Sequence, residues 1–257
     1  FSYTIATCNS ISNEEGVDPN KIAKAMRDGY MNQQLAGLEG TTLAALTELV
    51  GGQHWESVGK EGELEGNSPA LRSAPLAFVL DPLNTADQDI IREVCEITHP
   101  ADDAYPGVIA LLCSIRFVQN DRQNFLNRLV RVLPDSKVKD QLKALAESSD
   151  KRIRDVGRQF GCSNVMHESV PFAIYASLQA PEIGLATMMN EIVAAGGDTD
   201  ANCTLAGFIA GACLGADAIP EEWIKKLKAT EYFDDYYGSI KEFASFVQKQ
   251  SGIQTLF

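Results

Sequence analysis

The chain has 257 residues and a formal charge of −13, which argues against a nucleic-acid scaffold or an anionic membrane surface as its partner, because both would repel it. Hydrophobic residues make up 45% and charged residues 22%, as in ordinary soluble globular proteins, so the length suffices to bury a substantial core. The charge does not exclude a small anionic ligand held by backbone amides or by a metal ion.

The six cysteines contain no Cys-x-x-Cys pair, and most lie in apolar surroundings, which is typical of buried free thiols in a reducing compartment. The longest apolar run, from Leu205 to Ala216, is too short to span a bilayer, and no signal peptide is evident. We therefore expect a cytoplasmic protein without a membrane partner. Because the chain begins at Phe1 and not at Met, we also expect a processed product or a fragment.

The first elements expected along the chain are helices. Asp18 followed by Pro19 is a helix-start signature, and Gly40-Thr41-Thr42 precedes a second helical run over 43–49. The stretch from Gly51 to Ser68 is rich in glycine and charge and predicts a surface loop that runs directly into a helix. Binding residues often lie on such loops.

Further helical patterns follow with short breaks between them. They are expected over 87–98, 104–119, 121–132, 136–147, 150–160 and 169–176, over a segment that Pro181 starts and Ala195 ends, from Ile219 onward, and over 239–248. No sustained period-2 alternation and no tandem repeat interrupts them. The sequence predicts one all-α domain over residues 1–257, with ten or more helices and no linker.

A glycine pair and two carboxylates open one of these helices, in the stretch Gly196-Gly197-Asp198-Thr199-Asp200. Hard divalent cations take several oxygen ligands, and Asp198 and Asp200 could supply two of them from one turn. Alternatively, one Asp simply caps the helix. An EF-hand is excluded, because the glycine and glutamate of that loop are replaced by Cys203 and Ile209.

Glycine recurs at every fourth position of the same helix, at Gly207, Gly211 and Gly215. A face almost bare of side chains allows close helix packing. We therefore expect this helix at the centre of the bundle, with its N-terminus at a pocket.

Four ordered segments resemble those of the ADP-ribosylglycohydrolase family. They are Gly66-Asn67-Ser68-Pro69-Ala70-Leu71-Arg72, Thr98-His99-Pro100, Glu168-Ser169-Val170-Pro171 with the residues up to Tyr175, and the stretch from Gly196 through Trp223. The resemblance covers nearly the whole chain. It implies an all-helical, single-domain orthogonal bundle with a two-magnesium centre, which hydrolyses the bond between ADP-ribose and a protein side chain or related acceptor. The implied partner is an ADP-ribosylated protein or a small molecule that contains ADP-ribose.

The resemblance also implies roles for individual residues. Asp198 and Asp200 would be magnesium ligands and catalytic, and Gly196, Gly197 and Thr199 would shape the turn beside the ribose. His99 and the Gly66-Asn67-Ser68 loop would line the groove for ADP-ribose. Some family members carry an acid just before the Thr-Thr segment, and the nearest one here is Glu39, a further catalytic candidate.

Other roles remain open for several of these residues. His99 before Pro100 could cap a helix end, Asn67-Ser68 could be an ordinary turn, and Arg72 could form a salt bridge below the pocket. His54 and His167 match no motif and are expected to be structural or exposed.

The sequence departs from the family pattern at two points. The acidic cluster that supplies the other metal ligands is absent, since the first thirteen residues contain no Asp or Glu, and Ala201 stands where members carry a hydroxyl ligand. Two carboxylates make a poor magnesium site. Two hypotheses follow: a magnesium-dependent hydrolase whose remaining ligands lie upstream of Phe1, or a non-catalytic relative that serves as a structural, crystallin-like or ADP-ribose-binding protein.

Overall fold

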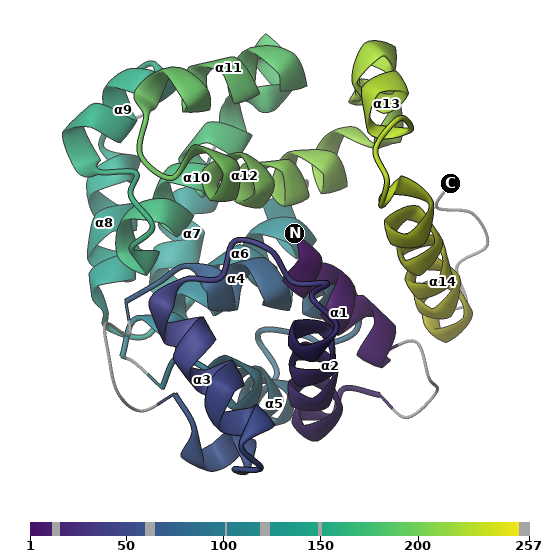
Figure 1. Cartoon of the computed structure of the whole chain (residues 1–257). Helices are drawn as coiled ribbons and strands as arrows, with labels where there is room; N and C mark the ends of the chain where they lie inside the picture. The colour runs from purple at the N-terminus through teal and green to yellow at the C-terminus, as the bar shows by residue number, and fades with distance from the viewer. Residues whose placement is uncertain (12–15, 60–64, 101, 119–123, 149–150, 252–257) are drawn as a thin grey trace.

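The computed structural model describes residues 1–11, 16–59, 65–100, 102–118, 124–148 and 151–251 (Figure 1). The helices in this part of the chain are α1 (Ser2–Ile11), α2 (Pro19–Met31), α3 (Gly40–Val50), α4 (Ser68–Ser73), α5 (Thr85–Glu96), α6 (Ala104–Phe117), α7 (Phe125–Val132), α8 (Lys137–Ala146), α9 (Ile153–Phe160), α10 (Met166–Ile183), α11 (Leu185–Ala195), α12 (Thr199–Leu214), α13 (Glu221–Leu227) and α14 (Phe233–Ser251). The described residues also form the short 3₁₀ helices η1 (Trp55–Ser57), η2 (Ala74–Phe78) and η4 (Ala216–Ala218). The described residues contain no strand, only an isolated bridge between Gly66 and Val165, so the predicted all-α class is confirmed.

Three helices, α6, α10 and α12, form the centre of the molecule. The residues of α6 from Ala104 to Ile115 are all buried, and α10 packs against α6, α8, α11 and α12. In Figure 1, α1, α2, α3 and α5 gather in the lower half and α8 to α12 in the upper half. The N-terminal and C-terminal parts of the chain therefore meet across the middle of the fold, where α4 contacts both α1 and α12.

Helix starts follow the capping residues in the sequence. Asp18 caps α2 through its side chain, which accepts a hydrogen bond from the backbone N–H of Asn20, and Pro19 is the first helical residue, as predicted. Ser136 caps α8 in the same manner. The helices expected from 121 and from 150 begin at Phe125 and Ile153, and residues 119–123 and 149–150 lie outside the described part.

The prediction that Pro181 starts a helix is wrong. Pro181 lies in the last turn of α10, which runs unbroken from Met166 to Ile183 and also contains Pro171. The chain breaks at Gly184, whose φ of 82° is accessible to glycine at little cost. Burial of α10 from Ser169 to Ser177 outweighs the backbone hydrogen bonds that the two prolines remove.

Helix α12 is central, but its glycine face is not the reason. A side chain at Gly211 would meet no atom within 4 Å, and one at Gly207 would touch only the end of Met189. The packed face of α12 instead consists of Ala201, Asn202, Leu205, Ala206, Ile209 and Ala210, which are buried. Gly215 has a separate role, since it ends the helix with a φ of 78°.

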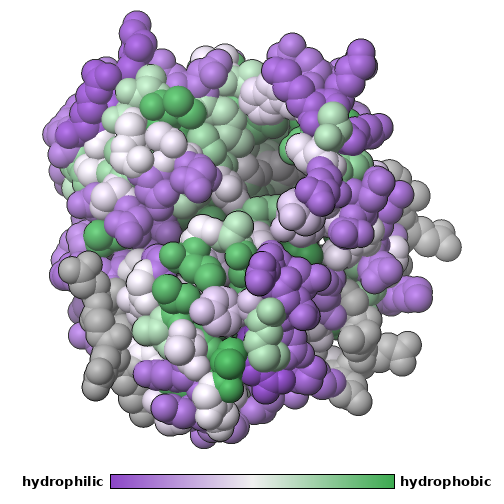
Figure 2. Space-filling view, in the orientation of Figure 1, coloured by the Kyte–Doolittle hydropathy of each residue, from purple (hydrophilic) through white to green (hydrophobic). Residues whose placement is uncertain are grey.

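The C-terminal part extends beyond α12 as α13 and α14. The last helix is longer than the predicted 239–248, and it packs against α1. The face seen in Figure 2 is hollowed near α12 and α13, and apolar residues border the hollow. None of the helices in the described residues is both long enough and apolar enough to cross a membrane.

Candidate active site

A pocket of about 250 Å³ opens where the N-terminus of α12 faces the segment before α3. Its lining residues are Phe1, Tyr3, Ala36, Gly37, Leu38, Glu39, Asn67, Ser68, Leu71, Asn164, Asp198, Asp200, Ala201 and Thr204. Three of them are acidic and none is a lysine or an arginine. An anionic ligand in this pocket therefore needs backbone amides or a cation to offset the carboxylates.

The two aspartates of α12 both reach the pocket. Asp198 occupies the N-cap position, and its Oδ2 accepts a hydrogen bond of 2.8 Å from Nδ2 of Asn67. Burial raises the pKa of Asp198, and the nearby carboxylate of Asp200 adds to the rise, although the amide of Asn67 opposes it. Asp198 thus takes the N-cap position without a side-chain capping hydrogen bond, and it presents its carboxylate to the pocket.

Gly196 and Gly197 shape the turn that places Asp198. Both have positive φ, at 87° and 72°, and a Cβ at Gly197 would overlap the backbone carbonyl of Cys162. That carbonyl also accepts the backbone N–H of Asp198 at 2.9 Å. Thr199 is the first residue of α12 and does not line the pocket. The glycine pair therefore brings the chain close to Cys162 and turns it into α12.

A chain of buried hydrogen bonds joins the sequence motifs. Asn67 donates to Oγ of Ser169 at 2.9 Å, Ser169 donates to Asn202 at 2.7 Å, and Asn202 donates to the carbonyl of Cys162 at 2.7 Å. An isolated β-bridge pairs Gly66 with Val165, and the backbone N–H of Asn67 donates to the carbonyl of Asn164. These contacts fix the loop before α4 against the start of α10. Segments more than a hundred residues apart are thereby brought together at one pocket.

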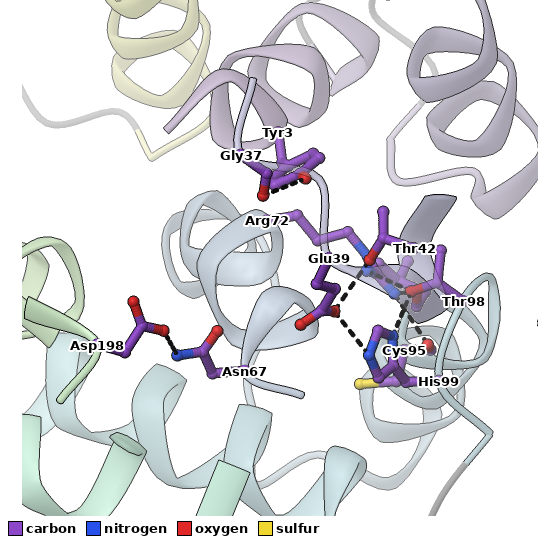
Figure 3. A network of polar contacts seen from close by, with 11 residues as sticks. Tyr3, Gly37, Glu39, Thr42, Asn67, Arg72, Cys95, Thr98, His99 and Asp198 are labelled. Atoms are coloured by element: carbon purple, nitrogen blue, oxygen red, sulfur yellow. Dashed lines mark hydrogen bonds and ion pairs between the residues drawn. The ribbon is translucent and has the colours of Figure 1, made fainter. Parts of the chain in front are cut away.

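Glu39 lies on another wall of the pocket, at the N-cap of α3. Its Oε1 accepts a hydrogen bond of 3.0 Å from the Thr42 hydroxyl and lies 2.8 Å from Nε2 of His99 (Figure 3). Burial by itself would raise the pKa of Glu39, but contacts with His99, Ser68 and Thr42 outweigh burial and lower it. Gly66 permits this position, because a Cβ there would collide with the carboxylate of Glu39.

His99 is not at the pocket surface. Its side chain is fully buried behind Glu39, and its Nδ1 lies 2.7 Å from the hydroxyl of Thr98. Arg72 is also fully buried and donates to Thr98 at 2.7 Å and to the carbonyls of Val94 and Cys95 at the end of α5. Neither residue is placed to touch a ligand in the pocket, and no carboxylate in the described part lies within ion-pair distance of Arg72. His54 is exposed and His167 is partly buried 3.9 Å from Asp103, both away from the pocket.

Several lining residues had no signal in the sequence. Tyr3 reaches the pocket from α1, and its hydroxyl donates to the carbonyl of Gly37 at 3.1 Å, whereas Phe1 reaches it from just before α1. Asn164 and Thr204 contribute from the loop before α10 and from α12. Only the tertiary fold identifies them, because none stands in a recognisable spacing with another polar residue.

The model of the ADP-ribosylglycohydrolase family matches residues 1–252. The chain belongs to this family. An uncharacterized protein of Archaeoglobus fulgidus is 24% identical over 224 residues, which is 85% of this chain and 71% of that protein. Human and mouse ADP-ribosylhydrolase ARH3 are 25% and 26% identical over 202 residues, which is 66% of this chain. The alignments span only 55% and 54% of the human and mouse proteins.

A solved structure named "ADP-ribosylglycohydrolase-related protein complex" shares the family fold. Its TM-score to this chain is 0.71 at 18% identity, and the match covers 96% of this chain and 80% of that one. At this identity the likeness concerns the fold. The predicted fold type is therefore confirmed, and the site roles of individual residues stay predictions.

The pocket supplies only part of the ligand set that a divalent cation needs. Asp198 and Asp200 offer neighbouring carboxylates, and their mutual repulsion is a reason to bind a cation. However, the described residues contain no group of three or more His, Cys, Asp or Glu side chains that could hold a metal ion. The described residues thus offer two candidate ligands and no complete cation site.

Proposed function

We propose that the protein hydrolyses the glycosidic bond between ADP-ribose and a protein side chain or a related acceptor. The observation that carries the proposal is the pocket at the start of α12, where Asn67 and Asp198 converge from two family segments and Glu39 joins them from the N-cap of α3. A family assignment alone would not place these side chains on one cavity. Their convergence gives the pocket both acidic groups for the ribose and a helix N-terminus for the pyrophosphate.

Each wall of the pocket has a part in this proposal. The ionised carboxylate of Glu39 accepts hydrogen bonds from ribose hydroxyls and orients the sugar. Asn67 holds the carboxylate of Asp198 toward the cavity. The N-terminus of α12 attracts a phosphate oxygen through the positive end of the helix dipole. The acceptor side chain leaves through the mouth of the pocket, which is open to solvent beside Asp200, an exposed residue.

Asp198 and Asp200 are proposed as two ligands of a magnesium ion. When bound, such an ion would polarise ribose hydroxyls and hold a water molecule for attack at the anomeric carbon. The other ligands would have to come from substrate, from water or from outside the described residues, since two carboxylates do not complete the octahedral shell of Mg²⁺.

A second function is favoured by the incomplete ligand set and by Ala201, which lines the pocket without a hydroxyl. The protein would then bind ADP-ribose without cleaving the glycosidic bond. Both hypotheses place ADP-ribose in the same pocket, and they differ only in whether the glycosidic bond is hydrolysed.

Calorimetry and product analysis separate the two functions. ADP-ribose is titrated into the protein with and without Mn²⁺ or Mg²⁺, and hydrolysis is followed on a protein ADP-ribosylated at serine or arginine. Asp198→Asn and Asp200→Ala should each weaken metal-dependent binding about tenfold or more, whereas the exposed Asp217→Asn should not. Binding with release of ADP-ribose supports the hydrolase, and binding without release supports the second function. If the parent binds neither metal nor ADP-ribose, both proposals fail.

A further inference from the structure

The fully buried guanidinium of Arg72 poses an electrostatic problem. A buried cation is costly unless a negative charge or several hydrogen bonds compensate it, and its contacts are two backbone carbonyls and the Thr98 hydroxyl. Its Nε has no hydrogen-bond partner in the described part of the chain. Burial lowers the pKa of Arg72 to about 10, and the charge of Glu39 is among the influences that oppose this fall. The compensating negative charge lies beyond Thr98 and His99, on Glu39 (Figure 3).

For a neutral imidazole, one arrangement of donors and acceptors between these two charges places a proton, and not a lone pair, against the carboxylate of Glu39. A guanidinium can only donate, so the Thr98 oxygen accepts from Arg72. The single hydroxyl proton of Thr98 is then free to point to Nδ1 of His99, 2.7 Å away. Nδ1 then accepts, and Nε2 carries the proton and lies 2.8 Å from Oε1 of Glu39, a contact at ion-pair distance that falls outside hydrogen-bond geometry. The reverse tautomer would set an unprotonated Nε2 against a carboxylate and leave the hydroxyl proton without an acceptor.

The charge state of the imidazole agrees with this arrangement. Burial lowers the pKa of His99 and the Arg72 charge acts in the same direction, against the opposing influence of Glu39, so that the ring is neutral at pH 7. A neutral imidazole has one donor and one acceptor nitrogen, as this arrangement needs. In each contact, from Arg72 through Thr98 and His99 to Glu39, the residue farther from the pocket is the donor.

We propose that Arg72, Thr98 and His99 form a one-directional relay of polar contacts that holds Glu39 ionised and in a fixed orientation toward the ligand. This inference rests on the proposed function, in which Glu39 contacts the ribose. The three residues are positioning residues, since none of them lines the pocket. The relay explains why a fully buried arginine lies beneath an acidic pocket without a direct carboxylate partner.

The relay has a consequence for the ligand. Thr42 and His99 both occupy Oε1 of Glu39, so they fix the rotation of the carboxylate. Ser68 also contacts this carboxylate, so the lone pairs that these three donors leave are the ones available to a hydroxyl of the sugar. A Glu39 without the relay would be free to turn and to take up a proton, and each change removes an acceptor from the ligand.

Nuclear magnetic resonance of the full chain tests the relay directly. The protein has only three histidines, and His99→Gln assigns the resonances of His99. At pH 7 we expect the His99 signal to show a protonated Nε2 and an unprotonated Nδ1. In Thr98→Val, the Nδ1 resonance should move because it loses the hydroxyl donor, and Thr98→Ser should restore it. A ring protonated at Nδ1, or at both nitrogens, overturns the relay whether or not the protein has the proposed activity.

A double-mutant cycle tests the action of the relay on the ligand. Thr98→Val should lower kcat/KM, or the affinity for ADP-ribose if the protein only binds, by about 10- to 100-fold, which is typical for loss of an outer contact to a site residue. Thr98→Ser should recover most of the loss. In a Glu39→Gln background, Thr98→Val should change the same quantity by less than about twofold, because the relay no longer has a carboxylate to act on. An equal loss in both backgrounds overturns the proposal.

Thr7→Val is the matched control, because Thr7 is also a fully buried threonine, and its hydroxyl donates within α1 to the carbonyl of Tyr3. It should leave the His99 spectrum unchanged, whereas a similar change in Thr7→Val and Thr98→Val would show a general effect of removing a buried hydroxyl and overturn the proposal. If the parent neither binds nor cleaves, the proposed function fails and the spectra alone decide the relay.

Discussion

The carboxylate of Asp198 and the side-chain amide of Asn67 lie 2.8 Å apart, although 131 residues separate them in the chain. The same amide nitrogen also donates to Ser169, so one side chain joins the start of α4, α10 and α12. The pocket depends on these contacts of Asn67, because they orient the carboxylate of Asp198 at the N-terminus of α12 toward the cavity.

Replacement of Asn67 should weaken both stability and binding. Asn67→Ala removes donors to a buried hydroxyl and to a carboxylate, so the free energy of unfolding should fall by about 1–3 kcal/mol. Affinity for ADP-ribose should fall as well, since Asp198 loses its orientation. Urea denaturation and calorimetry measure the two effects. The exposed Asn190→Ala should change neither by more than about 0.5 kcal/mol, and an equal effect of both substitutions would contradict this role of Asn67.

Alanine substitution at two glycines of this region should change the free energy of unfolding in opposite directions. Gly197→Ala places a Cβ against the carbonyl of Cys162 at a φ of 72°, so we expect a loss of about 2 kcal/mol or more. Gly211→Ala has open space inside α12 and should stabilise the protein by up to about 1 kcal/mol through helix propensity. Thermal or urea unfolding compares the pair. A destabilised Gly211→Ala would show that the glycine face packs against something after all.

A hydroxyl at position 201 should strengthen cation binding. Ala201 is buried at the pocket wall, one residue after Asp200, and Ala201→Thr adds an oxygen there. We expect Mn²⁺ to bind about tenfold more tightly in titration calorimetry, as for one added hard ligand. Ala201→Val has nearly the same shape and no oxygen. If it tightens Mn²⁺ binding equally, or if neither variant does, the hydroxyl is not a ligand.

Acid should destabilise the protein through His99 and Glu39. The pKa of His99 is lower in the folded protein than its ordinary 6.5, because of burial, so the unfolded state takes up the proton first and stability falls as pH drops below 6.5. The contacts of Glu39 lower its pKa below 4.5 despite burial, and this contribution is lost at more acidic pH. Unfolding free energies measured between pH 7 and pH 4 should therefore decline.

The variant His99→Gln should show a smaller decline over the same range, although it is less stable at pH 7. The exposed His54→Gln should keep the parent's pH dependence. If His99→Gln keeps it too, the histidine is not the group that titrates.

The amino-acid sequence by itself determined the helical class and the family. Helix starts such as Asp18-Pro19 depend on bonds within a few residues, and so they are visible in the sequence. The two aspartates of α12 were also evident as a pair, because one turn of chain carries both. Local patterns fail where packing decides, as at Pro181, which continues α10 because the helix is buried.

Only the tertiary structure decided how the site is built. Glu39 and His99 are sixty residues apart, and nothing local reveals that the histidine lies behind the glutamate and not on the pocket wall. Likewise, Arg72 comes to lie behind Thr98, His99 and Glu39 only when the end of α5 packs against α4. The physical reason is that burial and hydrogen-bond partners depend on long-range packing, and these set the charge and the orientation of each group at the pocket.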